Sequence, residues 1–142
     1  MQLSNEEKKK YLRSYLNLKA REAELEEEIE ELRSRYAGHA IIYSDMPKGT
    51  ADKDLSNYAA EVDELERRLR IMQQEAIRIY LQISDAIEKV EKITERQVLR
   101  IRYLQGITDW DVIGDKMGYS RTHAARIHGS ALLHFKVPGK ML

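Results

Sequence analysis

Apolar residues recur at alternating intervals of three and four positions over the first two thirds of the 142-residue chain. This spacing places them on one face of a helix, and its persistence over several heptads is typical of coiled coils. The first run, interrupted in character only by Glu22, is Tyr11, Tyr15, Leu18, Leu25, Ile29, Leu32 and Tyr36. The second run is Leu55, Tyr58, Val62, Leu65, Leu69, Met72, Ala76, Ile79, Ile83, Ala86 and Val90. The pattern predicts helices from about Asn5 to Tyr36 and from Asp54 to Lys92, about 48 and 58 Å long.

The connection between these two helices, residues 37–53, contains Gly38, Pro47 and Gly49, which together can reverse the chain. Helices of this length must bury their apolar stripes against each other or against copies of the chain. We expect an antiparallel hairpin. Because the second helix is about 10 Å longer, its last apolar positions, residues 79–90, need a partner in the C-terminal region or in a second chain. A homodimer is therefore expected.

Three shorter helical patterns follow in residues 93–136. Their apolar positions are Val98, Ile101 and Leu104, then Val112, Ile113 and Met117, then Ala124, Ile127 and Ala131. These stripes would close a small three-helix core. The fold class expected is all-α: an acidic coiled-coil hairpin over residues 1–92, a helix-turn-helix domain over residues 93–136 and a flexible tail over residues 137–142.

Start and stop signals support the three short helices. Thr94 with Gln97 fits a capping box, and Thr108 and Ser120 are N-cap residue types before the next two helices. Gly106 and Gly118 suit turns in which φ is positive.

The third short helix begins with polar residues that its apolar stripe leaves free. A recognition helix places such residues against base edges in the major groove, where Arg is the commonest reader of guanine. The base-reading candidates are Ser120, Arg121, Thr122 and Arg126. The alternative for each residue is a solvated position on a surface helix.

Residues 95–103, 106–108 and 117–120 resemble region 4 of sigma-70-type factors, with the sequences ERQVLRIRY, GIT and MGYS. With the coiled segment ahead of it, the chain resembles phage and prophage proteins of Gram-positive hosts related to the ArpU and RinA late-gene regulators. The resemblance implies a helix-turn-helix that reads promoter DNA, with host RNA polymerase as a possible partner. Ala124 stands where the sigma pattern has a larger β-branched residue.

Charge is distributed unevenly along the chain although its net value is zero. Residues 1–91 carry 15 Lys and Arg against 20 Asp and Glu, whereas residues 92–142 carry 9 against 4, a net charge of +5. A basic C-terminal third suits phosphate contacts, which supply most non-specific affinity for DNA. The phosphate-contact candidates are Lys92, Arg96, Arg100, Arg102, Lys116 and Lys136. Ordinary surface variation is the alternative.

Composition favours a soluble intracellular protein, and the resemblance to phage proteins implies the cytoplasm of the bacterial host. The chain has no cysteine and no apolar run near the ~20 residues that span a bilayer, and its first residues lack signal-peptide character. We therefore expect no membrane association. Seven glutamates between Glu22 and Glu31 are interpreted as the solvated side of the coil. The segment 41–49 is interpreted as a structural turn, since it lacks the leading glycine of a phosphate loop.

Catalytic signatures are lacking in the sequence. The histidines, at positions 39, 123, 128 and 134, do not form the helical pair with a third ligand that zinc uses. We expect neither an enzyme nor a cofactor or metal, but a sequence-specific DNA-binding regulator, a phage late-gene activator. The alternatives are a small terminase-like DNA-packaging protein and a coiled-coil adaptor that binds only protein.

Overall fold

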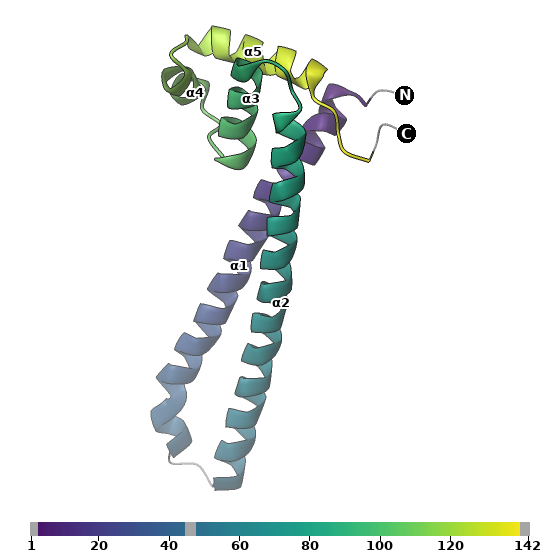
Figure 1. Ribbon diagram of the computed structural model, residues 1–142. Coiled ribbons are helices and arrows are strands. Elements are labelled where there is room, and N and C mark those ends of the chain that lie inside the picture. The colour runs from purple at the N-terminus through teal and green to yellow at the C-terminus, as the bar shows by residue number, and fades with distance from the viewer. Residues whose placement is uncertain (1–2, 45–47, 140–142) are drawn as a thin grey trace. The chain divides into compact units, whose positions relative to one another are not determined.

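The regular elements of the chain are helices, and no strand occurs in the part that the structure describes (Figure 1). The computed structural model describes residues 3–44 and 48–139, with side chains for residues 3–37 and 53–139. The elements are α1 (Asn5–Ser44), α2 (Lys48–Glu88), α3 (Ile93–Leu99), the π-helical turn η1 (Arg100–Leu104), α4 (Trp110–Met117) and α5 (Arg121–His134). The expected all-α fold class is confirmed. Within the described ranges, no helix is long and apolar enough to cross a membrane.

The long helices differ in their bounds from the expectation. Both extend into the predicted connection, because α1 continues to Ser44 and α2 begins at Lys48. A single helical glycine costs only about 1 kcal/mol, so Gly38 does not end α1. At the other end, α2 stops at Glu88 instead of residue 92, because the next two amides bond to carbonyls three residues back. The side chains of the predicted turn at 41–49 lie outside the described residues.

The chain divides into two compact units. The terminal unit comprises Met1–Leu18 and Ala76–Leu142, and the paired-helix unit comprises Lys19–Glu75. Both long helices contribute to each unit. The boundaries between the compact units therefore lie at residues 18–19 and 75–76 and not at residue 92. The division into functional domains at residues 1–92 and 93–136 stays a prediction.

The paired-helix unit holds antiparallel segments of α1 and α2. Arg33 forms an ion pair with Glu66. The rings of Tyr36 and Tyr58 stack with centroids 4.0 Å apart and planes inclined by 12°. These pairs join later residues of α1 to earlier residues of α2, as antiparallel packing requires. The predicted stripe positions Leu25, Ile29 and Val62 are buried, whereas Leu55 is exposed.

Glu22 is a buried carboxylate within the apolar stripe. Its side chain is almost fully enclosed, and Oε1 accepts a hydrogen bond from Lys19 Nζ at 3.0 Å. The other oxygen, Oε2, has no hydrogen-bond partner among the described residues. A polar residue at such a position lowers stability but can fix the register of paired helices.

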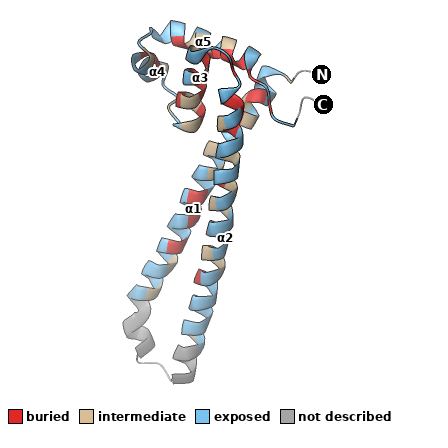
Figure 2. Ribbon diagram, viewed as in Figure 1, coloured by how far each residue is buried: buried red, intermediate tan, exposed pale blue. Residues whose placement is uncertain are grey.

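The terminal unit contains the main hydrophobic core, which buries residues of the long helices as well as of the short ones (Figure 2). The long helices contribute Leu12, Ile83, Ala86 and Ile87. The largest fully buried side chains of the core are Leu12, Ile83, Ile87, Val98, Leu99, Tyr103, Ile113, Leu132 and Phe135. The predicted three-helix core is therefore incomplete by itself. The surplus stripe of α2 packs within the same chain, which removes that argument for a homodimer. Val137, in the predicted tail, is also buried.

The inward face of α4 differs from the predicted one. Val112 is 42% exposed, whereas Ile113 and Gly114 are buried and Trp110 and Met117 pack against the core. These four positions follow the i, i+3, i+4, i+7 spacing of a helix face, which leaves Val112 outside it.

Lys8 fastens the first turns of α1 to the end of α5. Its Nζ donates a 2.7 Å hydrogen bond to the carbonyl of Leu132 and a longer one, 3.4 Å, to that of Leu133. Only 8% of Lys8 is exposed, and burial lowers the pKa of its ammonium group. The last carbonyls of a helix lack helical partners, so a cation there satisfies them and opposes the negative end of the helix dipole.

Replacing Lys8 by Met should therefore destabilise the terminal unit. Loss of a charged donor to buried carbonyls should lower the free energy of unfolding by about 1–3 kcal/mol. Urea denaturation measures the change, with Lys10→Met as the control because Lys10 is exposed on the same helix. Equal midpoints for the two variants would contradict the assigned role of Lys8.

Candidate functional site

Helices α4 and α5 are each preceded by a residue whose side chain caps the helix. Ser120, as predicted, caps α5 by accepting a hydrogen bond from the backbone N–H of His123 at 3.1 Å. The cap of α4 is Asp109 instead of Thr108, and its carboxylate accepts from the N–H of Asp111 at 2.8 Å. Asp and Thr are both cap residue types, so the sequence alone did not separate these neighbours.

The capping box predicted at Thr94 and Gln97 is wrong. Helix α3 begins after Lys92, which caps it without a side-chain hydrogen bond, and Thr94 therefore lies within the first turn. The first intrahelical bond runs from Arg96 N to the Lys92 carbonyl. A capping hydroxyl must belong to the residue that precedes the helix.

A tight turn connects α4 to α5. Gly118 has φ of 78°, Tyr119 N donates to the Gly114 carbonyl at 2.8 Å, and Gly118 N donates to the Asp115 carbonyl at 3.3 Å. These two bonds form a Schellman motif. A Cβ at Gly114 would lie 2.6 Å from the carbonyl oxygen of Tyr119, so only glycine lets the chain pass so close. The predicted positive φ at Gly106 and Gly118 is confirmed.

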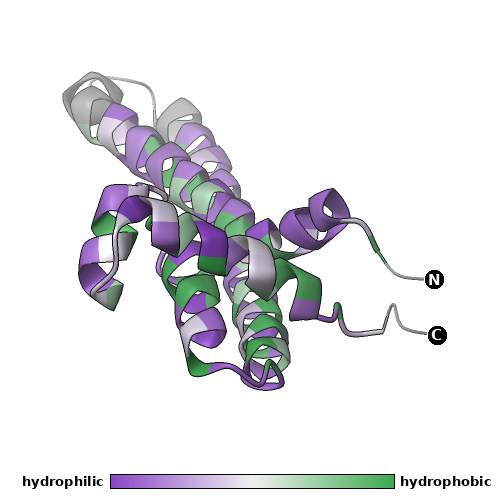
Figure 3. Ribbon diagram, turned by 90° about the horizontal axis from the view of Figure 1, so that it is seen from above, coloured by the Kyte–Doolittle hydropathy of each residue, from purple (hydrophilic) through white to green (hydrophobic). Residues whose placement is uncertain are grey.

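Helix α5 buries one face and leaves the opposite face exposed. Ala124, His128, Ala131 and Leu132 are buried, whereas Thr122, Arg126, Gly129 and Leu133 are exposed. The exposed four follow the i, i+4, i+7, i+11 spacing of one face; we call this the outer face of α5. Figure 3, which looks down on α5, shows hydrophilic residues along its first turns.

The four base-reading candidates lie at the N-cap and in the first two turns of α5. They differ in whether their side chains already bind other groups of the chain. The Ser120 hydroxyl is used in capping. Arg121 Nε lies 3.8 Å from the Asp111 carboxylate of α4, and both side chains are mostly exposed. Thr122 and Arg126 are exposed and form no hydrogen bond or ion pair with another described side chain. Arg126 is therefore the freest guanidinium of this helix.

Three of the phosphate-contact candidates are engaged within the chain. Arg96 donates to the carbonyls of Val90 and Glu91 at 2.6 and 2.9 Å. Arg100 pairs with Glu88 and reaches Ser84. Arg102 donates to the Thr108 carbonyl and places its guanidinium 4.6 Å from the ring centre of Trp110. These contacts hold short connections in place, a role that charge counting did not reveal.

The three lysines among the candidates are exposed. Lys116 lies near the end of α4, whereas Lys92 and Lys136 line one pocket although they are far apart in sequence. None of the three forms an ion pair within the described residues. The structure therefore brings Lys92 and Lys136 together and leaves Lys116 separate from that pocket.

A buried histidine of α5, His128, joins this helix to η1 and α4. His128 Nε2 lies 2.7 Å from the Tyr103 hydroxyl, and its ring packs against Trp110 with centroids 5.2 Å apart. Burial lowers the pKa of His128 to about 4, and the nearby cations Arg102, Lys9 and Arg13 act in the same direction. A neutral ring can accept the hydrogen bond that the tyrosine hydroxyl donates.

A buried carboxylate ties α3 to the second half of α5. Glu95 is 2% exposed and accepts hydrogen bonds from Ser130 Oγ at 2.8 Å and His134 Nδ1 at 2.7 Å. Burial alone would raise the pKa of Glu95, but these hydrogen bonds and the charges of His134 and Lys92 hold it below its ordinary value. No local pattern indicates this pairing, because its partners are 35 and 39 residues away.

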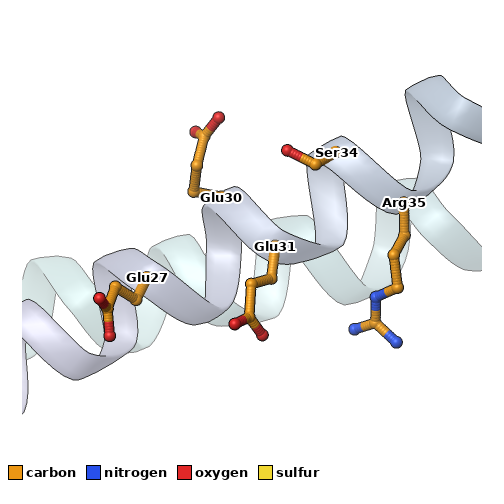
Figure 4. Close-up of a pocket in the computed structure, with 5 residues that line it drawn as sticks. All are labelled: Glu27, Glu30, Glu31, Ser34 and Arg35. Atoms are coloured by element: carbon orange, nitrogen blue, oxygen red, sulfur yellow. The ribbon is translucent and has the colours of Figure 1, made fainter.

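The acidic run of α1 forms a hollow on the paired-helix unit (Figure 4). Glu27, Glu30, Glu31, Ser34 and Arg35 line it, and all five belong to one helix. No group of three or more potential metal ligands occurs among the described residues. Glu27, Glu30 and Glu31 are exposed, in keeping with the interpretation of this run as a solvated face, whereas Glu22, the first residue of the run, is buried.

Opposite effects are expected for alanine at two glycines. Gly114→Ala places a Cβ against the Tyr119 carbonyl and should lower the free energy of unfolding by about 1–3 kcal/mol. Gly129→Ala meets no atom within 4 Å and should raise it by about 0.5–1 kcal/mol, since alanine favours helix. Thermal or urea denaturation checks both. Destabilisation of equal size in both variants would refute the account of the turn.

The protein should lose stability as the pH falls from about 6.5 to about 4. In this range the unfolded chain protonates His128 whereas the folded chain does not, because its pKa is lowered to about 4. The slope should approach 1.4 kcal/mol per pH unit. NMR titration of the ring gives the pKa directly, and His128→Gln should flatten the slope, while His123→Gln, at an exposed site, should not. A His128 ring that titrates near 6.5 in the folded protein would rule this out.

Comparison with known proteins places the chain by sequence. No curated protein and no solved structure matches it. The model of one protein family, described as a protein of unknown function (DUF1492), matches residues 40–135, more than half of the chain. The chain therefore belongs to the DUF1492 family.

Proposed function

We propose that the protein is a sequence-specific DNA-binding regulator in which α4 and α5 act as a helix-turn-helix. The outer face of α5 is the observation that carries this proposal. It presents Thr122 and Arg126, which form no hydrogen bond or ion pair with other described side chains. The beginning of this helix is held by the Ser120 cap and the Schellman motif. Recognition helices need such a rigid mount and such residues near their beginning.

Gly129 adds a steric argument for the outer face. It lies in the middle of α5, where alanine would be more stable, and no atom lies within 4 Å of the position that a Cβ would take there. Packing within the described chain therefore does not require a glycine. A glycine on an exposed helix face allows close approach of another molecule. The DNA backbone or the edge of a base pair is the partner we propose for it.

Carboxylates of α4 lie near the proposed DNA-binding surface and compete with DNA for its arginine side chains. Asp111 lies beside Arg121, and Asp115 is also exposed on α4. Binding to DNA must turn Arg121 away from Asp111 toward the duplex. The exchange favours the phosphate-rich ligand at low salt, because exposed ion pairs contribute little.

The resemblance to sigma region 4 and to phage late-gene regulators directs the proposal toward promoter DNA. Activation of phage late genes is the role we propose, with host RNA polymerase as a second partner. A packaging protein would assemble into a ring of many subunits, so the mass of the protein in solution separates the two roles.

Selection of bound duplexes from a random pool tests the proposal. A discrete motif should be enriched, and its symmetry reports whether one or two copies of the chain bind. An absence of enrichment at low salt, with the protein folded, would sink the proposal and favour a protein-only adaptor.

Arg126→Ala should weaken binding to the selected motif by about 1–3 kcal/mol and relax the preference at one base position. Arg21→Ala is the matched control, because Arg21 is an exposed arginine of α1 in the paired-helix unit. Fluorescence anisotropy with motif and mutated duplexes measures both effects. Similar losses for the two variants would show that Arg126 contributes only charge.

A further inference from the structure

A pocket of about 430 Å³ lies in the terminal unit, away from the beginning of α5. It is lined by the chain between α2 and α3, by Glu95 of α3, and by the last residues of α5 with Lys136. Its walls thus come from two segments of the sequence, residues 89–95 and 133–136, which only the fold brings together.

Three lysines and one histidine make up half of the eight residues that line the pocket. Lys89, Lys92 and Lys136 line it, and none forms an ion pair within the described residues. Two carboxylates also line it. The Glu95 carboxylate is buried, accepts hydrogen bonds from Ser130 and His134 and interacts electrostatically with Lys92. The Glu91 side chain forms no hydrogen bond or ion pair among the described residues, so the three lysines outnumber the two carboxylates of the lining.

Two sets of internal bonds hold the pocket walls in place. Arg96 donates to the carbonyls of Val90 and Glu91 and so fixes the connection that carries Lys89 and Lys92. On the other wall, His134 Nδ1 donates to Glu95, which leaves the opposite ring nitrogen without a partner among the described residues. The backbone that carries Lys89 and Lys92 and the ring of His134 are therefore held in place before any ligand arrives, which reduces part of the entropy cost of binding.

We propose that this pocket binds a phosphate group through Lys89, Lys92, Lys136 and His134. Lysine ammonium groups bind phosphate as point charges. The source we favour is a backbone phosphate of the duplex bound by α5, an inference that rests on the proposed function. Arg126 and His134 are eight residues apart, about 12 Å along the helix at about 1.5 Å per residue. The major groove is about 12 Å wide, so a backbone phosphate lies within a similar distance of any base that Arg126 contacts.

The salt dependence of duplex binding tests the favoured source. In the double variant Lys92→Gln, Lys136→Gln the slope of log K against log salt should become shallower by about 1, since the loss of one phosphate contact removes about 0.9. The control is Lys10→Gln, Lys53→Gln, which removes the same charge from exposed positions elsewhere. The selected motif should stay the same in both variants.

Titration with inorganic phosphate and with pyrophosphate, followed by NMR, tests the pocket without DNA. Shifts of the His134 ring and of the amides of residues 89–92, absent from the double variant, support a phosphate site. A reduced salt slope identifies the source as DNA, and an unchanged slope with these NMR shifts identifies a free phosphate compound. An unchanged slope without NMR shifts overturns the proposal. If the wild-type protein binds no DNA, the proposed function fails and the titration alone decides on the pocket.

Discussion

The three short helices of the terminal unit depend on apolar surface that the two long helices supply. With 7, 8 and 14 residues, α3, α4 and α5 do not enclose the core of the terminal unit by themselves, because residues of α1 and α2 form part of it. Leu12 of α1 and Ile83 and Ile87 of α2 are among these residues, and all three are fully buried. The surface on which the proposed DNA reading depends is therefore rigid only while the long helices are in place.

Buried polar groups determine how the helices of this unit are oriented. Lys8 donates to the last carbonyls of α5, and Glu95 accepts hydrogen bonds from two side chains in the second half of α5. His128, in the middle of the same helix, is hydrogen-bonded to Tyr103. Each of these contacts would leave a buried group unsatisfied if α5 rotated, and an unsatisfied buried group costs more than a hydrogen bond contributes. Apolar packing alone would tolerate such a rotation more easily. The polar contacts thus fix which residues of α5 face outward.

Periodic features of this fold could be read from the sequence, whereas long-range contacts could not. The 3-4 spacing predicted most buried positions of the long helices, but it included the exposed Leu55 and missed the buried Leu12 and Ile87. The local chemistry of Ser120, Gly106 and Gly118 predicted one cap and two turns. The face of α4 was misjudged by the inclusion of Val112, because eight residues give a weak periodic signal. The need for glycine at position 114 could not be predicted from neighbouring residues. It arises because the backbone of Tyr119, five residues later, passes close to it. Among the candidate site residues, Arg96, Arg100 and Arg102 resembled free cations because their backbone and side-chain acceptors are set by tertiary structure.

The contact between Lys8 and Leu132 also bears on how the protein folds as it is made. The two residues are separated by 124 positions, so a ribosome that adds about 5–20 residues per second needs roughly 6 to 25 s to produce the second after the first. Until then the apolar beginning of α1 has no permanent cover, and the end of α2 lacks it from the time that Glu88 is made. Newly made chains must pass through this interval with those ends exposed, and chaperones that bind apolar segments would act during it.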